Sequence, residues 1–193
     1  MANQDAPFGF RAVRMSGSAP SSNGQTQYLI ANGYNTAIFQ GDPVEMVAGG
    51  SLEVANGVAD VMVGVFNGVE YVDSTTKKPT FANFHTAGTT ASDGIIKAFV
   101  IDDPNQLFEI QVTGAFTNAD IGATANLLYT AGSTHSGTSK VEVNSSTFGT
   151  GANTAVKVVG LSGDPENQDT TSDNANIIVK INKHLYSANT AGI

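Results

Sequence analysis

The segment 95–112 is the part of the sequence that most constrains the fold. Two runs rich in β-branched and aromatic residues, 95–101 and 106–112, flank the breaker Asp102-Asp103-Pro104-Asn105. In the second run apolar and polar residues alternate, which is the period of a strand with one buried side. The segment therefore predicts two strands joined by a tight turn, a β-hairpin at the centre of the chain.

Similar strand-and-turn patterns occur on both sides of this segment. Short apolar runs are separated by turn pairs such as Asn32-Gly33 and Asn56-Gly57. The run 61–66 is almost continuously apolar, which predicts a central strand covered on both faces. Strong helix formers are scarce. We therefore expect an all-β chain that forms a single antiparallel β-sandwich or β-barrel domain with an extended N-terminal arm.

Length and composition divide the chain into three predicted parts. At 193 residues, 40% of them apolar, it can bury the core of one domain. Residues 1–26 form the predicted arm, because they combine two prolines with a Ser/Gly/Asn-rich stretch and have no evident strand partner. Residues 27–187 form the sandwich or barrel, and residues 188–193 form a polar C-terminal tail.

Charge and cysteine content exclude several classes of partner and site. The net charge of −8 argues against nucleic acid, which needs a concentrated basic surface. No apolar run approaches the ~18 residues of a membrane-spanning helix. The chain has no cysteine, so disulfides, thiolate metal sites and cysteine nucleophiles are excluded. The first residues lack the pattern of a signal peptide.

No motif predicts catalysis, a metal or a cofactor. His85, His135 and His184 are far apart in sequence and show no ligand spacing. Two acidic segments, 102–105 and 164–173, offer oxygens that Ca²⁺ could use, but neither follows the EF-hand order, and turn formation explains both. We expect a protein that is not an enzyme and has no catalytic residue, no metal site and no cofactor.

The N-terminal arm is the strongest candidate for a binding surface. It contains both arginines of the chain, Arg11 and Arg14, beside the apolar residues Phe8, Phe10 and Val13. A merely solvated tail has little reason to contain large apolar side chains. This pattern predicts an arm that attaches to a neighbouring protein while the acidic body faces solvent.

Several segments, taken in order, carry a resemblance to a known family. They are Pro7-Phe8-Gly9-Phe10-Arg11-Ala12-Val13-Arg14, Gly41-Asp42-Pro43-Val44, Gly64-Val65-Phe66-Asn67-Gly68-Val69-Glu70-Tyr71, Asp102-Asp103-Pro104-Asn105 with Phe108-Glu109-Ile110-Gln111, and Val179-Lys180-Ile181-Asn182-Lys183-His184. In this order they resemble small structural proteins encoded near the major capsid gene of tailed bacteriophages, including marine and cyanobacterial phages. Some of these are capsid cement (decoration) proteins.

The resemblance implies a role and a partner. The chain would bind the outer surface of the virion capsid after assembly in the host cytoplasm, and would bridge neighbouring subunits of the major capsid protein. It would form a homo-oligomer, with a trimer favoured. In the arm, Phe8, Phe10 and Val13 would be apolar anchors, and Arg11 and Arg14 would pair with carboxylates of the shell.

Two alternatives remain open at this point. One is a head-fibre or tail-associated component of the virion. The other is a carbohydrate-binding module for host adhesion, although such modules usually present exposed aromatic residues and the chain has no tryptophan.

Overall fold

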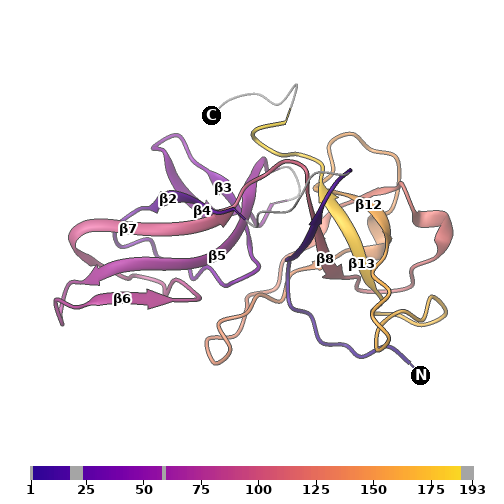
Figure 1. The fold of residues 1–193 in the computed structure, drawn as a ribbon, viewed down its shortest axis with the longest axis horizontal. Helices are drawn as coiled ribbons and strands as arrows, with labels where there is room; N and C mark the ends of the chain where they lie inside the picture. Colours follow the sequence, from indigo (N-terminus) through magenta and orange to yellow (C-terminus); the bar gives the residue numbers. More distant parts are fainter. Residues whose placement is uncertain (1, 18–23, 58–59, 188–193) are drawn as a thin grey trace.

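The computed structural model describes residues 2–17, 24–57 and 60–187, and shows an elongated molecule with two lobes (Figure 1). The barrel lobe contains β2 (Thr26–Ile30), β3 (Pro43–Met46), β4 (Ser51–Val54), β5 (Met62–Asp73), β6 (Pro79–Ala82) and β7 (Ala91–Ile101). The sheet lobe contains β1 (Arg11–Met15), β8 (Gln106–Gln111), β9 (Thr124–Ala125), β10 (Leu127–Leu128), β11 (Glu142–Val143), β12 (Val156–Leu161) and β13 (Asn176–Ile181).

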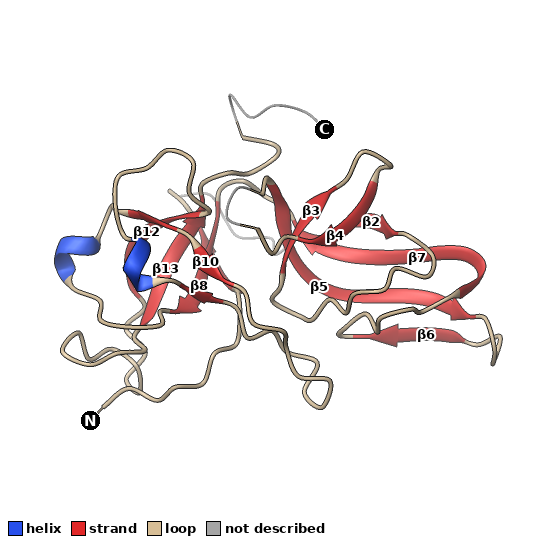
Figure 2. Cartoon of the chain, turned by 180° about the vertical axis from the view of Figure 1, so that it is seen from behind, coloured by secondary structure: helices blue, strands red, loops and turns tan. Residues whose placement is uncertain are grey.

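The all-β fold class is confirmed. The only helical elements in the described residues are the short 3-10 turns η1 (Asn118–Asp120) and η2 (Ser145–Thr147), both in the sheet lobe (Figure 2). Within the described part of the chain, no helix has the length and apolar character to cross a membrane. The predicted C-terminal tail, residues 188–193, lies outside the described residues.

The barrel lobe is a single sheet that closes on itself. Its strand order is β3-β4-β2-β7-β5-β6, and an additional pairing of β3 with β5 joins the two ends, so that only β6 stands outside the closure. All pairings are antiparallel except that of β2 with β4. Each of the five closed strands contributes apolar side chains to one buried cluster. This closure leaves β6 as the short edge strand of the lobe.

The sheet lobe is a sandwich-like arrangement. Its five-stranded sheet has the order β1-β8-β13-β12-β9, and the two-stranded ribbon of β10 and β11 packs with it around a second buried cluster. Strand β8 lies between β1 and β13, and all its residues are buried. Burying one Phe or Ile side chain contributes roughly 1.5–3 kcal/mol, so β8 is central to the stability of this lobe.

Strand β5 contributes to both clusters. Met62 and Val65 belong to the cluster of the sheet lobe, whereas Val63 and Phe66 belong to the cluster of the barrel lobe. This explains the continuous apolar run that predicted a strand covered on both faces. The strand continues through Gly68 with a shift of register, which is a β-bulge.

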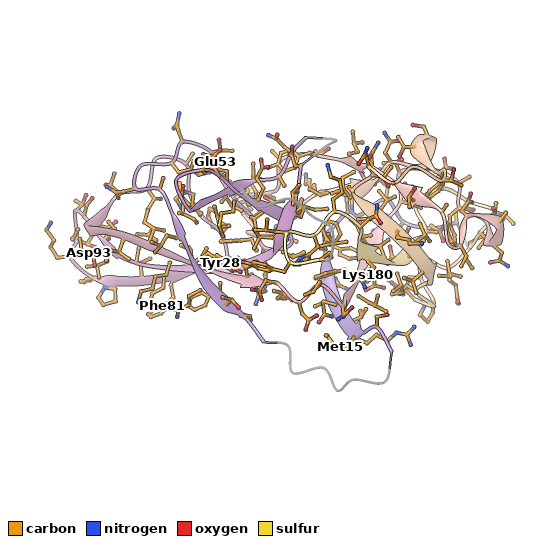
Figure 3. The ribbon with its side chains drawn as sticks, turned by 90° about the horizontal axis from the view of Figure 1, so that it is seen from above. Met15, Tyr28, Glu53, Phe81, Asp93 and Lys180 are labelled. Carbon is orange, nitrogen blue, oxygen red and sulfur yellow. The ribbon has the colours of Figure 1, made fainter. Side chains whose placement is uncertain are left out.

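The predicted central hairpin is wrong in its pairing. Both strands exist as β7 and β8, but β7 pairs with β2 and β5 in the barrel lobe, whereas β8 pairs with β1 and β13 in the sheet lobe. The turn at 102–105 passes the chain from one lobe to the other. The hydroxyls of Thr26 and Tyr28 donate hydrogen bonds to Asp102 at 3.0 and 2.7 Å, which fixes this crossing. Figure 3 shows Tyr28 in the barrel lobe and Met15 at the end of β1 in the sheet lobe.

The predicted arm is extended, but it does have a strand partner. Residues 2–10 have no regular secondary structure, and residues 11–15 form β1, which pairs with β8 in antiparallel register. The expectation that this segment lacks a strand partner is therefore wrong. The physical reason is that without β1 the buried strand β8 would leave the hydrogen-bonding groups of one sheet edge unpaired.

A glycine substitution tests the junction of the two lobes. Gly41 has a φ of +92°, and a Cβ there would lie 2.9 Å from the Phe8 carbonyl oxygen. Gly50, in the turn between β3 and β4, has a φ of +75° but open space around it. Both Gly→Ala variants should lose about 1 kcal/mol from backbone strain, and Gly41→Ala should lose about 1–3 kcal/mol more from the steric conflict. Urea unfolding of both variants measures this difference, and equal losses would contradict it.

Candidate protein-interaction surface

The first residues are held to the sheet lobe by side-chain amides. Asn3 Nδ2 donates to the Asp169 carbonyl at 2.8 Å. The Asn167 side chain bonds to Gln4 twice, accepting from its backbone nitrogen at 3.0 Å and donating to its carbonyl at 2.8 Å. Gln111 Nε2 donates to the same carbonyl at 2.9 Å. These bonds fix the backbone of the segment and leave β1 in a defined position.

Phe10 is part of the core and is not available to a neighbour. Its side chain is 4% exposed, and its ring packs edge-on against Phe108 with 5.6 Å between centroids. Its backbone nitrogen donates to the Gly41 carbonyl at 2.9 Å. The assignment of Phe10 as a capsid-binding anchor is therefore wrong, because its apolar ring stabilises its own subunit.

The other predicted residues lie on or beside β1, which is an edge strand. Among the described residues β1 pairs only with β8, so its other edge has no strand partner; beside the start of β1 lies the cavity at the lobe junction. Val13 is 40% exposed and sits where the register shifts by a bulge, and Arg14 is exposed next to it. No ion pair joins Arg14 to another described residue. An apolar and a cationic side chain thus project from a strand that has a partner on one edge only.

Arg11 is oriented by two contacts. Its guanidinium lies 4.2 Å from the centroid of the Phe8 ring and 3.3 Å from a Glu109 carboxylate oxygen. Glu109 is buried and also accepts a hydrogen bond from the Ser162 hydroxyl. The Arg11 side chain is still 61% exposed, so part of its planar donor set faces solvent. Such a guanidinium suits bidentate binding of a carboxylate.

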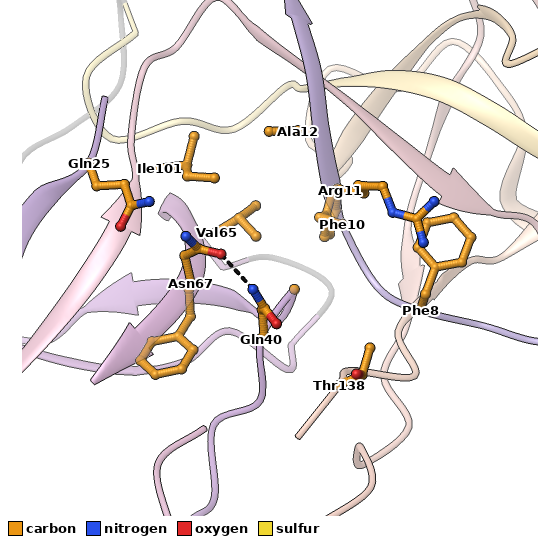
Figure 4. A pocket seen from close by; sticks show the side chains of 12 residues that line it. Phe8, Phe10, Arg11, Ala12, Gln25, Gln40, Val65, Asn67, Ile101 and Thr138 are labelled. Atoms are coloured by element: carbon orange, nitrogen blue, oxygen red, sulfur yellow. Dashed lines mark hydrogen bonds between the residues drawn. The ribbon is translucent and has the colours of Figure 1, made fainter. Parts of the chain in front are cut away.

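A cavity of about 450 Å³ lies where the lobes meet, beside the start of β1 (Figure 4). Phe8, Phe10 and Arg11 form one side of it, and residues of the barrel lobe form the other. On that other side Gln40 donates a hydrogen bond to Asn67 at 2.9 Å. The sequence did not predict this cavity, because its walls come from segments that are remote along the chain.

Asp42 is a buried carboxyl group at the same junction. It is 0% exposed, and its Oδ2 accepts from the Phe39 backbone nitrogen at 2.8 Å. Burial raises the pKa of Asp42 from 3.8 to about 6, although the hydrogen bonds from Ser139 and Phe39 partly oppose this. Its Oδ1 has no hydrogen-bond partner in the described part of the structure. In the sequence Asp42 gave only the signal of a turn before Pro43.

The histidines and acidic segments do not converge. His85 and His184 are both buried, at separate places, and burial lowers the pKa of each, whereas His135 lies in an exposed loop. Among residues 2–17, 24–57 and 60–187, no three His, Asp or Glu side chains are grouped as metal ligands. Asp103 and Asp169 each accept a hydrogen bond from a backbone nitrogen two residues further on, that of Asn105 at 2.7 Å and that of Thr171 at 2.9 Å, in keeping with the interpretation of both segments as turns.

Comparisons with known protein families, with curated proteins and with solved structures find no match to this chain. The interpretation of the surface therefore depends on its geometry and on the sequence resemblance described above.

The Asp42→Asn variant should flatten the pH dependence of stability. Because the pKa of Asp42 is raised from 3.8 to about 6 in the folded state, the folded protein resists deprotonation. The contribution of this group to the free energy of unfolding is therefore fully present below pH 3.8. It is lost as pH rises through about 6, and the total loss is roughly 3 kcal/mol. Urea unfolding across this range should show a steeper fall for the wild type than for the variant. Parallel curves would contradict the assignment.

The Asn167→Ala variant should release the first residues without unfolding the body. It removes the acceptor of the Gln4 backbone nitrogen and one of the two donors to the Gln4 carbonyl, at a cost of about 1–3 kcal/mol. Hydrogen exchange should show loss of protection at residues 3–6 and unchanged protection in β13. Asn118→Ala, at an exposed position in η1, is the control and should change neither region.

Proposed function

We propose that this chain is a non-enzymatic structural protein of a phage virion. It binds the outer surface of the capsid and stabilises the head by bridging neighbouring major capsid protein subunits. The sequence resemblance supports the proposed family, and one structural observation supports the proposed way of binding. That observation is the open edge of β1, which presents Arg11, Val13 and Arg14 on an otherwise acidic chain.

The open edge supports binding by strand addition. An extended segment of a capsid subunit can hydrogen-bond to the free backbone groups of β1, and side chains then give specificity. Val13 supplies an apolar contact, while Arg14 and the exposed part of Arg11 favour carboxylates on the incoming strand. The partner is therefore an extended, acidic segment of the shell.

The way in which β1 is held supports a role in transmitting force between capsid subunits. Strand β1 pairs with the buried strand β8, and the residues before it are bonded to Asn167 and Gln111. A force applied to β1 is thus transmitted to the core of the sheet lobe. Multiple copies on one head turn modest individual contacts into durable attachment.

A paired substitution on β1 tests the proposal. Val13→Glu with Arg14→Glu adds repulsion to the open edge but leaves the Arg11–Glu109 ion pair intact. Mixed with purified heads that lack the protein, this variant should bind at least about tenfold more weakly than the wild type, because acidic side chains would face an acidic segment. Electron microscopy and quantitation of bound copies measure attachment and its place on the particle.

The matched control lies on an inner strand of the same sheet. Val159 in β12 is 39% exposed, lies where that strand shifts register, and has the exposed Lys157 near it. Lys157→Glu with Val159→Glu makes the same change in charge and should bind heads like the wild type. Undiminished binding of the β1 variant, or attachment at the tail instead of the head, would refute the proposal.

A further inference from the structure

The barrel lobe exposes an apolar sheet face that the proposed capsid contact does not use. We define the outer barrel face by the outward side chains of Leu29, Glu70, Phe81, Ile95, Lys97 and Phe99. Phe81 is 71% exposed, Leu29 52% and Ile95 45%. Their neighbours Ile96 and Ala98 point inward and are fully buried, as strand alternation requires. Phe81 lies at the margin of the molecule in Figure 3.

Four of these residues form one row across four strands. Phe81 of β6 is paired with Glu70 of β5, Glu70 with Lys97 of β7, and Lys97 with Leu29 of β2. The central acid and base are 3.8 Å apart, and their side chains are 31% and 42% exposed. The row therefore reads apolar, negative, positive, apolar, with neighbouring strands roughly 4.8 Å apart.

A hollow of about 370 Å³ lies beside this row. It is lined by Phe81 and Phe99, and Gly68 has no side chain to fill it. The outer barrel face thus has the elements of an interface centre, which are aromatic residues and little unpaired charge.

The sequence of the row is complementary to itself. Consider a second copy whose outer barrel face lies against the first, related by a twofold axis that runs parallel to the strands between Glu70 and Lys97. This rotation reverses the order of the row in the second copy relative to the first. It places Glu70 of each copy against Lys97 of the other, and Phe81 of each copy against Leu29 of the other. Both charges then gain an opposite charge across the interface, and both apolar ends meet apolar ends.

We propose that the outer barrel face binds a second copy of this chain, giving a twofold symmetric dimer in place of the trimer that the sequence resemblance implies. This is independent of the proposed capsid binding, because β1 lies in the other lobe and its open edge remains free in the dimer. A different protein would have to present an apolar, basic, acidic and apolar side chain at the matching positions. A second copy of this chain presents them by symmetry.

Net charge also favours this face for self-association. The whole chain carries −8, so two copies repel each other over most orientations. The outer barrel face contains one acid and one base and is neutral. At ~3.3 Å per residue and about 4.8 Å per strand, five residues on each of its four strands cover a footprint of roughly 300 Å², the size of a weak and reversible contact.

Charge substitutions separate this contact from effects within one subunit. Glu70→Lys alone places two bases against each other across the interface, and Lys97→Glu alone places two acids against each other. Analytical ultracentrifugation should show a dimer for the wild type in the micromolar range and a monomer for each variant. An equimolar mixture of the two variants should form a heterodimer, because both contacts across the interface are then attractive while both contacts within a subunit remain repulsive.

Two controls and three contrary results complete the test. Lys157→Glu and Glu166→Lys make the same charge changes at exposed positions of the sheet lobe and should remain dimeric. A monomeric wild type would overturn the proposal, as would a trimer. It would also be overturned if the mixture of the two variants stayed monomeric, provided circular dichroism shows both variants folded.

Discussion

Strand β5 is the element on which the rest of the structure depends, because its apolar side chains enter two hydrophobic cores. Met62 and Val65 pack into the sheet lobe, and Val63 and Phe66 pack into the barrel lobe. Backbone bonds reinforce the same place, where Met62 exchanges hydrogen bonds with Lys183 and Leu185 at 2.9 and 2.8 Å. Two small cores thereby act as one body.

The N-terminal segment is attached at the same junction. Gly41 accepts a hydrogen bond from Phe10 and donates one to the Phe66 carbonyl, both at 2.9 Å, so its peptide connects the segment to β5. The residue must be glycine, because a Cβ would meet the backbone of Phe8 and Phe10. The open edge of β1 is therefore held rigidly, and a partner that adds to it does not first have to order a flexible arm.

The sequence predicted the strands far better than their pairing. The apolar patterns located β5 and β8. The alternation in β8 predicted one buried side, but all its residues are buried, since Glu109 and Gln111 bond to Arg11 and Gln4 of the N-terminal segment. The sequence did not reveal that β7 and β8 pair in different lobes. The turn residues at 102–105 determine only the local backbone, whereas the pairing of each strand depends on residues that are remote along the chain. The same limit applies to Phe10: a phenylalanine in a Gly- and Pro-containing segment gives no sign of whether its ring is buried in its own subunit or in a neighbour.

For the candidate surface, the sequence located Arg11, Val13 and Arg14 but not the strand that presents them. The most direct measurement of the central claim is a reconstruction of capsids decorated with this protein, at a resolution that separates β-strands. The account predicts that a segment of the major capsid protein continues the five-stranded sheet at β1, with density next to Arg14. A shell contact made by another part of the chain, with the edge of β1 facing solvent, would contradict it.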